Sequence, residues 1–436
     1  MTLRLIELND SGVRVFREGK IVCESPGVAI VEPNKVITGT AAQASAQLNP
    51  RAVNNQFWQH LNEVKLPNAN RQVRHHADLA YHHLRTVLAQ AGRPPDAVLA
   101  VPGHYDERQL ALLLGIAQAC DLKVSGLIDS AVAAVAGALP EGRYTVADIH
   151  QHHVTLTLVE VDETARRRSA KTIDQTGLNH IYEACVDLIS DAFMEQSRFD
   201  PLHEADTEQL LYTRLPKWLE EAANAPEIQI AVEYHGNRFS AKIPTREFSR
   251  VTEKVLAPIN DHLPGDSGLL LCARLAQLPG SVDHLAAIDV LAVDACYQGV
   301  AEHRLKLAGD GSGVPFVTAL PRAANPVLGR SKPRSEKTDA LGAATHLLAG
   351  SRALALSNSP LYLKPDGTVD KTPEVTEACA ISLDAGIATL RVNGADTRLN
   401  GELVSGSCQV RPGDHITLKG GRALFIPIAV FDSGAS

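Results

Sequence analysis

The chain has 436 residues, of which 44% are hydrophobic, and its formal net charge is −8 at pH 7. This length allows two or three compact units, and the mild negative charge argues against a nucleic-acid partner. No apolar run approaches the roughly 20 residues of a membrane-spanning helix, so no membrane partner is expected. Seven scattered cysteines without metal-type spacing and a start without a signal-peptide pattern predict a cytoplasmic protein with reduced thiols.

The first part of the chain predicts a meander of short strands followed by a helix. Strand-like segments cover residues 3–8, 13–16, 21–23 and 28–31. The helix is predicted from about Gln72 to Gln90 because Gly92 and two prolines follow it. The histidine pairs His75-His76 and His82-His83 are interpreted as part of its solvated face.

The segment from Ala97 to Gly137 is the most informative part of the sequence. A buried strand is predicted at 97–101, and a helix follows in which Asp106 and Gln109 have the spacing of a capping box. A second strand at 123–127 leads into a helix of almost only alanine and valine. Such a helix can approach a neighbouring helix very closely.

The remaining sequence predicts further strands, further helices and a separate C-terminal module. The predicted elements are strands at 144–148 and 155–161, helices at 179–194 and 207–223, a hairpin around His235-Gly236-Asn237 and a helix capped by Thr245. From residue 355 to 436, strand-like segments alternate with turn residues, which predicts a small all-β module.

The segment at 97–137 resembles the DnaK-type heat-shock chaperones of the actin-like ATPase superfamily. In that family V-P-A-Y-F precedes the same helix and N-E-P-T-A-A-A-L-A follows it. The corresponding segments here are V-P-G-H-Y and I-D-S-A-V-A-A-V-A. The resemblance implies an α/β fold with two lobes and ribonuclease-H-like halves. It places lobe I at 1–145, lobe II at 146–337 and, at 338–352, an alanine-rich closing helix that returns to lobe I.

The family holds its nucleotide between two hairpin turns whose glycines let backbone N–H groups approach the phosphates. The first turn, D-x-G-T-T-x-S in the family, corresponds here to E-L-N-D-S-G, which lacks the Gly-Thr core. Glu7 and Asp10 are either candidates for a vestigial nucleotide or metal site or parts of a plain hairpin turn. The family's lysine segment corresponds to F-W-Q-H-L, which has no lysine. Asp129 replaces the family glutamate and is interpreted as a helix N-cap, as a hydrogen-bond partner of metal-bound water, or as both.

The second turn, D-L-G-G-G-T in the family, is D-I-H-Q-H-H here. Asp148 is retained, but every glycine is lost, and His150, His152 and His153 add bulk where a phosphate would lie. A metal site is the alternative interpretation, in which His150 and His152, with Asp148 as a further candidate, share one face of an extended strand. Cleft-filling histidines are the preferred interpretation, and no metal is assigned.

The segment that contacts adenosine has also changed. Cys272 and Ala273 replace two glycines that lie against the nucleotide in the family. The resemblance therefore implies a degenerate member, a partner-binding scaffold in which ATP hydrolysis is weak or lost. ATP and Mg²⁺ remain possible ligands, and the protein partner and the oligomeric state stay open. The alternatives are an active chaperone-like ATPase with a remodelled site and an actin-like filament former.

Overall fold

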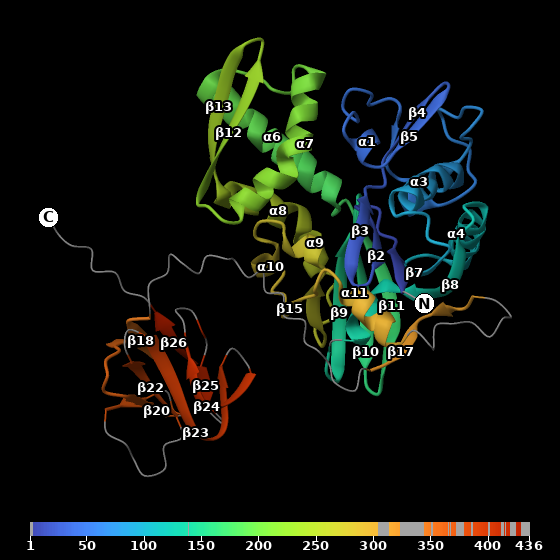
Figure 1. Cartoon of the computed structure of the whole chain (residues 1–436). Coiled ribbons are helices and arrows are strands. Elements are labelled where there is room, and N and C mark those ends of the chain that lie inside the picture. Colours follow the sequence, from blue (N-terminus) through green and yellow to red (C-terminus); the bar gives the residue numbers. More distant parts are fainter. Residues whose placement is uncertain are drawn as a thin grey trace. The chain divides into compact units, whose positions relative to one another are not determined.

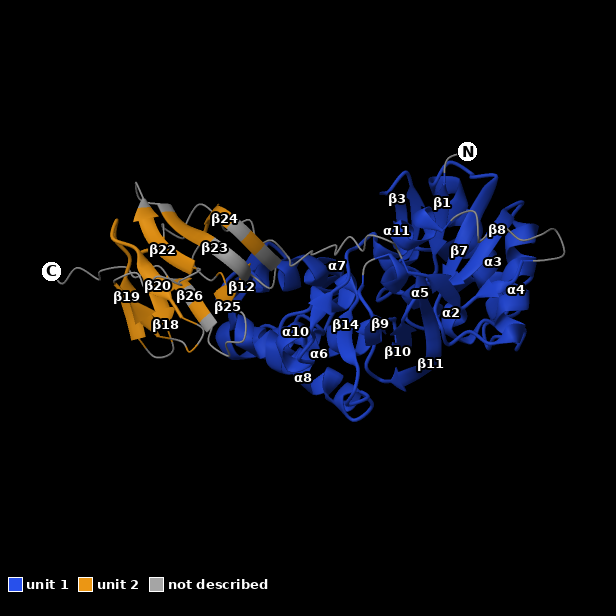
Figure 2. Ribbon diagram, turned by 90° about the horizontal axis from the view of Figure 1, so that it is seen from below, with its two compact units in different colours: residues 1–332 blue, residues 333–436 orange. Residues whose placement is uncertain are grey.

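The computed structural model has a mixed α/β architecture (Figure 1). It divides into two compact units, residues 1–332 and 333–436 (Figure 2). The residues that the structure describes are 3–137, 139–303, 314–322, 344–349, 352–364, 366, 368–371, 379–384, 387–399, 402–410, 414, 416–418 and 424–428.

The first unit begins with a six-stranded sheet of order β16-β8-β7-β1-β2-β3. Its strands are β1 (Arg4–Glu7), β2 (Val13–Arg17), β3 (Lys20–Ser25), β7 (Asp96–Val101), β8 (Lys123–Asp129) and β16 (Phe316–Val317). The first three strands form the antiparallel meander that the sequence predicts, and β7 and β8 add in parallel.

A second six-stranded sheet repeats this order, as β15-β14-β9-β10-β11-β17. Its strands are β9 (Gly142–Ile149), β10 (His153–Val161), β11 (Thr164–Asp174), β14 (Gly268–Leu271), β15 (Asp289–Val290) and β17 (Ala319–Pro321). An antiparallel meander is again followed by two parallel strands. The sheets differ at one edge, because β17 joins the meander side while β16 joins the parallel side.

The pairing of β16 corrects the predicted boundary of the second lobe. Phe316 and Val317 pair with Leu127 and Ile128 of β8, so this part of 146–337 belongs to the first sheet. Such a pairing between distant segments leaves no local signal in the sequence.

Helices α3 (His76–Gln90) and α4 (Glu107–Ala119) contribute to the hydrophobic core of the first sheet. The predicted capping box of α4 is confirmed, since Asp106 and Gln109 each accept from the other's backbone N–H.

The solvated face predicted for α3 is wrong at His83, which is fully buried. His83 lies between the Trp58 indole and the Ser25 hydroxyl. Smaller elements complete this part: α1 (Thr40–Gln43), α2 (Phe57–His60), β4 (Ala29–Glu32), β5 (Lys35–Thr38) and β6 (Val53–Asn54).

The second sheet shares a core with three long helices and a hairpin. These elements are α6 (Leu178–Ser197), α7 (Ala205–Ala222), α8 (Thr245–Asn260), β12 (Glu227–Tyr234) and β13 (Asn237–Pro244). The hairpin prediction is confirmed. The predicted cap is wrong: Thr245 is the first residue of α8, and its hydroxyl instead donates to the carbonyl of Ala225. Short helices α9 (Ala273–Ala276) and α10 (Ser281–His284) follow.

Helices α5 (Ser130–Ala136) and α11 (Ala295–Glu302) pack against each other within a core that residues of both sheets share. A Cβ at Gly299 would lie 1.8 Å from the carbonyl oxygen of Ala133, and one at Gly137 would lie 3.2 Å from the Cα of Gly299. The close approach expected of the alanine-valine helix is therefore confirmed.

The described residues of the second unit form strands and no helices. The strands are β18 (His346–Ala349), β19 (Arg352–Ala355), β20 (Leu361–Leu363), β21 (Val369–Asp370), β22 (Cys379–Asp384), β23 (Ile387–Leu399), β24 (Glu402–Gln409), β25 (Ile416–Leu418) and β26 (Leu424–Ile428). They belong to one nine-stranded sheet, in agreement with the predicted β module.

The closing helix predicted at 338–352 is wrong in its described part. His346–Ala349 is strand β18, which pairs with β19 on one side and β26 on the other. Leu347 of this strand is completely buried in the core of the second unit. Strand pairing and burial here override the helical preference of the local sequence. Residues 338–343 and 350–351 lie outside the described residues.

In the part of the chain that the structure describes, no helix combines the length and the apolar character needed to cross a membrane.

Candidate functional site

The two turns that the resemblance placed at the phosphates, after β1 and after β9, lie directly against each other. The side-chain amide of Asn9 donates to the carbonyl of Ile149 over 3.0 Å. In return, the backbone N–H of Gln151 donates to Asp10 Oδ1 over 2.8 Å, and its side-chain amide donates to the Asp10 carbonyl over 3.0 Å. All four residues are buried. Direct protein hydrogen bonds therefore join the turn after β1 to the turn after β9.

The start of α6 closes on the β9–β10 turn. The backbone N–H of Leu178 donates to the carbonyl of His150 over 2.8 Å. A Cβ at Gly177 would lie 2.3 Å from the carbonyl carbon of His152, so only glycine permits this approach. Gly177, at the start of α6, therefore packs closely against the β9–β10 turn, which itself contains no glycine.

Asp10 and His150 form a buried pair within this junction. The carboxylate Oδ1 of Asp10 lies 3.3 Å from His150 Nδ1, and both side chains are almost completely buried. Burial by itself would raise the pKa of Asp10, but the hydrogen bond and the charge of His150 lower it to about 2. At His150, burial by itself would lower the pKa of the imidazole. The hydrogen bond and the charge of Asp10 outweigh burial and raise this pKa above its usual value. The carboxylate Oδ2 of Asp148 lies 3.8 Å from His150 Nε2.

Three imidazole rings converge beside this pair. His104 follows β7, whereas His150 and His153 flank the β9–β10 turn. Their ring centroids lie 5.3 Å (His104 to His150), 4.9 Å (His104 to His153) and 4.6 Å (His150 to His153) apart. One nitrogen of each ring lies within 4.8 Å of the others, so this group could hold a metal ion. Burial lowers the pKa of His104 to about 3 and that of His153 to about 2, so both rings are neutral at pH 7.

The predicted grouping of His150 with His152 is wrong. The His152 ring turns away, and its Nε2 lies 3.0 Å from Asn55 Oδ1. Residues 150–152 form a turn and not an extended strand, so alternate positions do not share a face. The sequence interpretation also missed His104. Its only local signal is a histidine directly after the Pro102-Gly103 pair that ends β7.

Asp129 has two structural partners. Its Oδ1 accepts from the backbone N–H groups of Ala131 and Val132 at the start of α5, which confirms the N-cap. Its Oδ2 lies 3.0 Å from the guanidinium of Arg167. Burial raises the pKa of Asp129, while these partners act in the opposite direction. Both carboxylate oxygens of Asp129 therefore have protein partners. The suggested contact with metal-bound water gains no support from this arrangement.

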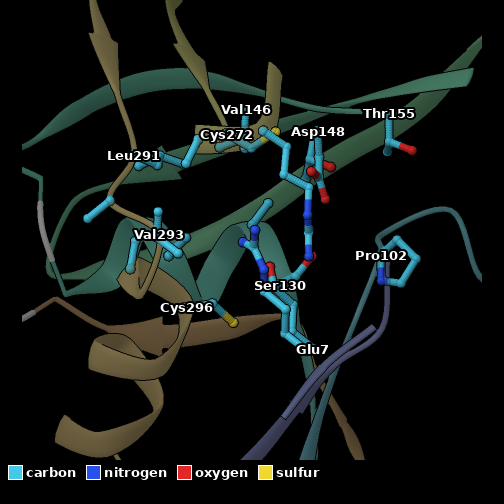
Figure 3. A pocket seen from close by; sticks show the side chains of 18 of the residues that line it. Glu7, Pro102, Ser130, Val146, Asp148, Thr155, Cys272, Leu291, Val293 and Cys296 are labelled. Carbon is cyan, nitrogen blue, oxygen red and sulfur yellow. The ribbon is translucent and has the colours of Figure 1, made fainter. Parts of the chain in front are cut away.

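A small cavity lies beside the junction (Figure 3), with a volume of about 40 Å³. It is lined by Glu7, Arg14, Pro102, Gly103, Ser130, Ala131, Ala134, Val146, Asp148, Thr155, Thr157, Cys272, Ala273, Arg274, Leu291, Ala292, Val293, Ala295 and Cys296. Burial raises the pKa of Glu7. Within the described chain, Glu7 Oε2 and Asp148 Oδ1 are buried without a hydrogen-bond partner.

The cavity brings together four of the predicted positions, Glu7, Asp148, Cys272 and Ala273. Figure 3 shows Asp148 and Cys272 on one wall and Glu7 on the opposite side. Cys272 and Ala273 line the space without filling it, whereas His150 and His153 are buried outside its lining. Arg274 reaches across from α9 to the carbonyl of Gly12 in the first sheet.

Comparison with known proteins adds no relative: no family model and no curated protein matches this chain.

Proposed function

We propose that this chain is a non-hydrolysing scaffold that binds a protein partner and is built on a two-lobed actin-like fold. The repeated strand order supports the fold, because two ribonuclease-H-like halves would each have an antiparallel meander followed by parallel strands. The small helix pair α5 and α11 then lies where the two halves meet.

The direct contact between the two turns is the observation that carries the proposal. A triphosphate needs free backbone N–H groups and open space between such turns. Here the N–H of Gln151 already donates to Asp10, and Asn9 bonds to Ile149 across the same gap. The neighbouring cavity leaves about 40 Å³ for the centres of water molecules, and one water needs about 10 to 15 Å³ on this measure, so the cavity has room for only a few waters.

A scaffold also fits the other features of the chain. The second unit is a separate compact unit with a sheet of its own. All seven cysteines are free in the described residues, which supports the proposed cytoplasmic location. The partner is a protein and not nucleic acid, because the chain is acidic overall.

Calorimetric titration of the intact chain with Mg-ATP, combined with a phosphate-release assay, tests the proposal. We expect no binding heat at micromolar to millimolar nucleotide and no turnover. Solution scattering should give the same profile with and without Mg-ATP, since no nucleotide closes the lobes. Micromolar binding with magnesium-dependent turnover would instead establish the active ATPase. Concentration-dependent sedimentation into long polymers would establish the filament former.

A further inference from the structure

We propose that His104, His150 and His153 form a binding site for one Zn²⁺ ion at the junction of the two sheets. This inference does not depend on the proposed scaffold function, since it concerns a different ligand.

Unpartnered nitrogens are the first line of evidence. Within the described chain, His104 Nε2, His150 Nε2 and both ring nitrogens of His153 are buried and have no hydrogen-bond partner. A buried polar atom without a partner costs about 1 to 3 kcal/mol, so several in one place require an explanation. A cation that accepts their lone pairs provides one, because it would satisfy one nitrogen of each ring at once.

In His104 and His150, the ring nitrogen that would not bind the zinc, Nδ1, has a polar partner, as is usual for metal-binding histidines. His150 Nδ1 faces the carboxylate of Asp10 at 3.3 Å, and His104 Nδ1 lies 3.2 Å from the hydroxyl of Thr155. A carboxylate or hydroxyl at Nδ1 places the proton there and directs the Nε2 lone pair toward the centre of the cluster. Asp10 and Thr155 would therefore be positioning residues for the site.

The donor set favours zinc. Imidazoles bind zinc and release any proton on the ligating nitrogen, and zinc sites with three histidines keep a fourth position for water or a carboxylate. Zinc-nitrogen bonds of about 2.0 to 2.1 Å require the nitrogens to lie about 3.4 Å apart. The ring nitrogens lie within 4.8 Å of one another, so small rotations of the rings complete the geometry. The carboxylate of Asp148, 3.8 Å from His150 Nε2, is the nearest candidate for the fourth position.

The site has a definite place in the fold, beside a narrow pocket. This pocket reaches His104 and His150, and it is lined by Leu8, Asp10, Trp58, Gln59, Pro102, His104, Tyr105 and His150. His104 belongs to the connection after β7 of the first sheet, while the other two ligands belong to the second sheet. Zinc at this position would cross-link the two sheets beside the hydrogen-bonded turns.

Titration of the chelator-treated, intact chain with ZnCl₂, followed by metal analysis after dialysis, tests the proposal. We expect one zinc per chain and a higher melting temperature with zinc. Substitution with Co²⁺ should give the visible absorption of a four-coordinate site without the near-ultraviolet band of a thiolate ligand. That band separates this site from binding at any of the seven cysteines.

Two variants and a matched control locate the site. His104→Ala removes a ligand that is only half-buried, and should weaken zinc binding at least tenfold while the circular dichroism spectrum stays unchanged. Asp10→Asn should weaken it by about 10- to 100-fold, because the carboxylate that faces His150 Nδ1 is lost. His152→Ala is the control, because this neighbouring ring faces Asn55 and should leave the affinity unchanged.

The proposal is overturned if the wild-type chain takes up no stoichiometric zinc, if the cobalt spectrum contains a thiolate band, or if His104→Ala binds zinc as tightly as wild type. Each result leaves the nucleotide experiments unaffected, so the two proposals fail separately.

Discussion

The junction between the two sheets has an apolar part and a polar part, and they hold the halves together differently. At the apolar part, α5 and α11 approach until Gly299 leaves no room for a Cβ beside Ala133. At the polar part, buried Asn9, Asp10 and Gln151 meet through directed hydrogen bonds. Close packing stabilises through contact area and tolerates no added volume, whereas hydrogen bonds contribute about 1 kcal/mol each but specify one geometry. The apolar part should therefore dominate stability, and the polar part should dominate positioning.

The largest expected effect is in the apolar part. Gly299→Val places a branched side chain against the carbonyl of Ala133, so α5 and α11 must separate. We expect the free energy of unfolding in urea to fall by about 3 kcal/mol or more. Gly115→Ala in α4 is the control, because the described atoms leave its Cβ position open. It should stabilise by about 0.5 to 1 kcal/mol. A tolerated Gly299→Val would show that the helices do not pack this closely.

Removal of a buried charged cap should have the next largest effect. Asp129→Ala removes the α5 cap and the partner of Arg167, with an expected loss of about 2 to 3 kcal/mol. Asp106→Ala removes a cap of the same kind from exposed surroundings, and should cost only about 1 kcal/mol. Both are measured by urea unfolding. Equal losses would mean that the Asp129–Arg167 pair contributes nothing beyond capping.

Acid should destabilise the protein through neutral buried histidines outside the proposed zinc site. The Trp58 indole donates to His83 Nδ1, and burial lowers the pKa of His83 to about 3. Between an unfolded pKa near 6.5 and this folded value, only the unfolded chain gains the proton. His83 therefore makes the free energy of unfolding fall by about 1.4 kcal/mol for each unit that the pH decreases in this window.

Replacement of His83 isolates this contribution. Between pH 6.5 and pH 3, His83→Gln should reduce the slope of the unfolding free energy against pH. The reduction should reach about 1.4 kcal/mol per pH unit, which corresponds to one proton. His203→Gln changes an exposed histidine and should keep the wild-type slope. If both variants have the same slope, His83 is not held neutral in the folded protein.

The smallest stability effect is expected at the polar part. Gln151→Ala removes one buried side-chain hydrogen bond to the Asp10 carbonyl, and should cost about 1 kcal/mol. It should not create Mg-ATP binding, because the Gln151 backbone and Asn9 still close the gap. Exposed Gln118→Ala should change stability by less than about 0.5 kcal/mol. Nucleotide binding by Gln151→Ala would show that one side chain alone keeps the phosphate position shut.

Local chemistry made much of the first unit predictable from the sequence. The capping box at Asp106, the hairpin at His235-Gly236-Asn237 and the N-cap at Asp129 depend on residues a few positions apart. The alanine-valine composition likewise predicted close packing of α5, because small side chains allow a neighbouring helix to approach closely wherever the helix lies. Alternating or helical periodicity identified most strands and helices for the same reason.

Tertiary structure alone decided which distant residues meet. The interpretation of residues 148–152 as an extended strand grouped His150 with His152, whereas the structure groups His150 with His153 and His104. Strand β18 replaced the closing helix because its neighbours offer pairing and burial. Sequence periodicity thus determined the elements, since it records one segment's own preferences. The junction, with its joined turns and converging imidazoles, exists only where two sheets far apart in the sequence come into contact.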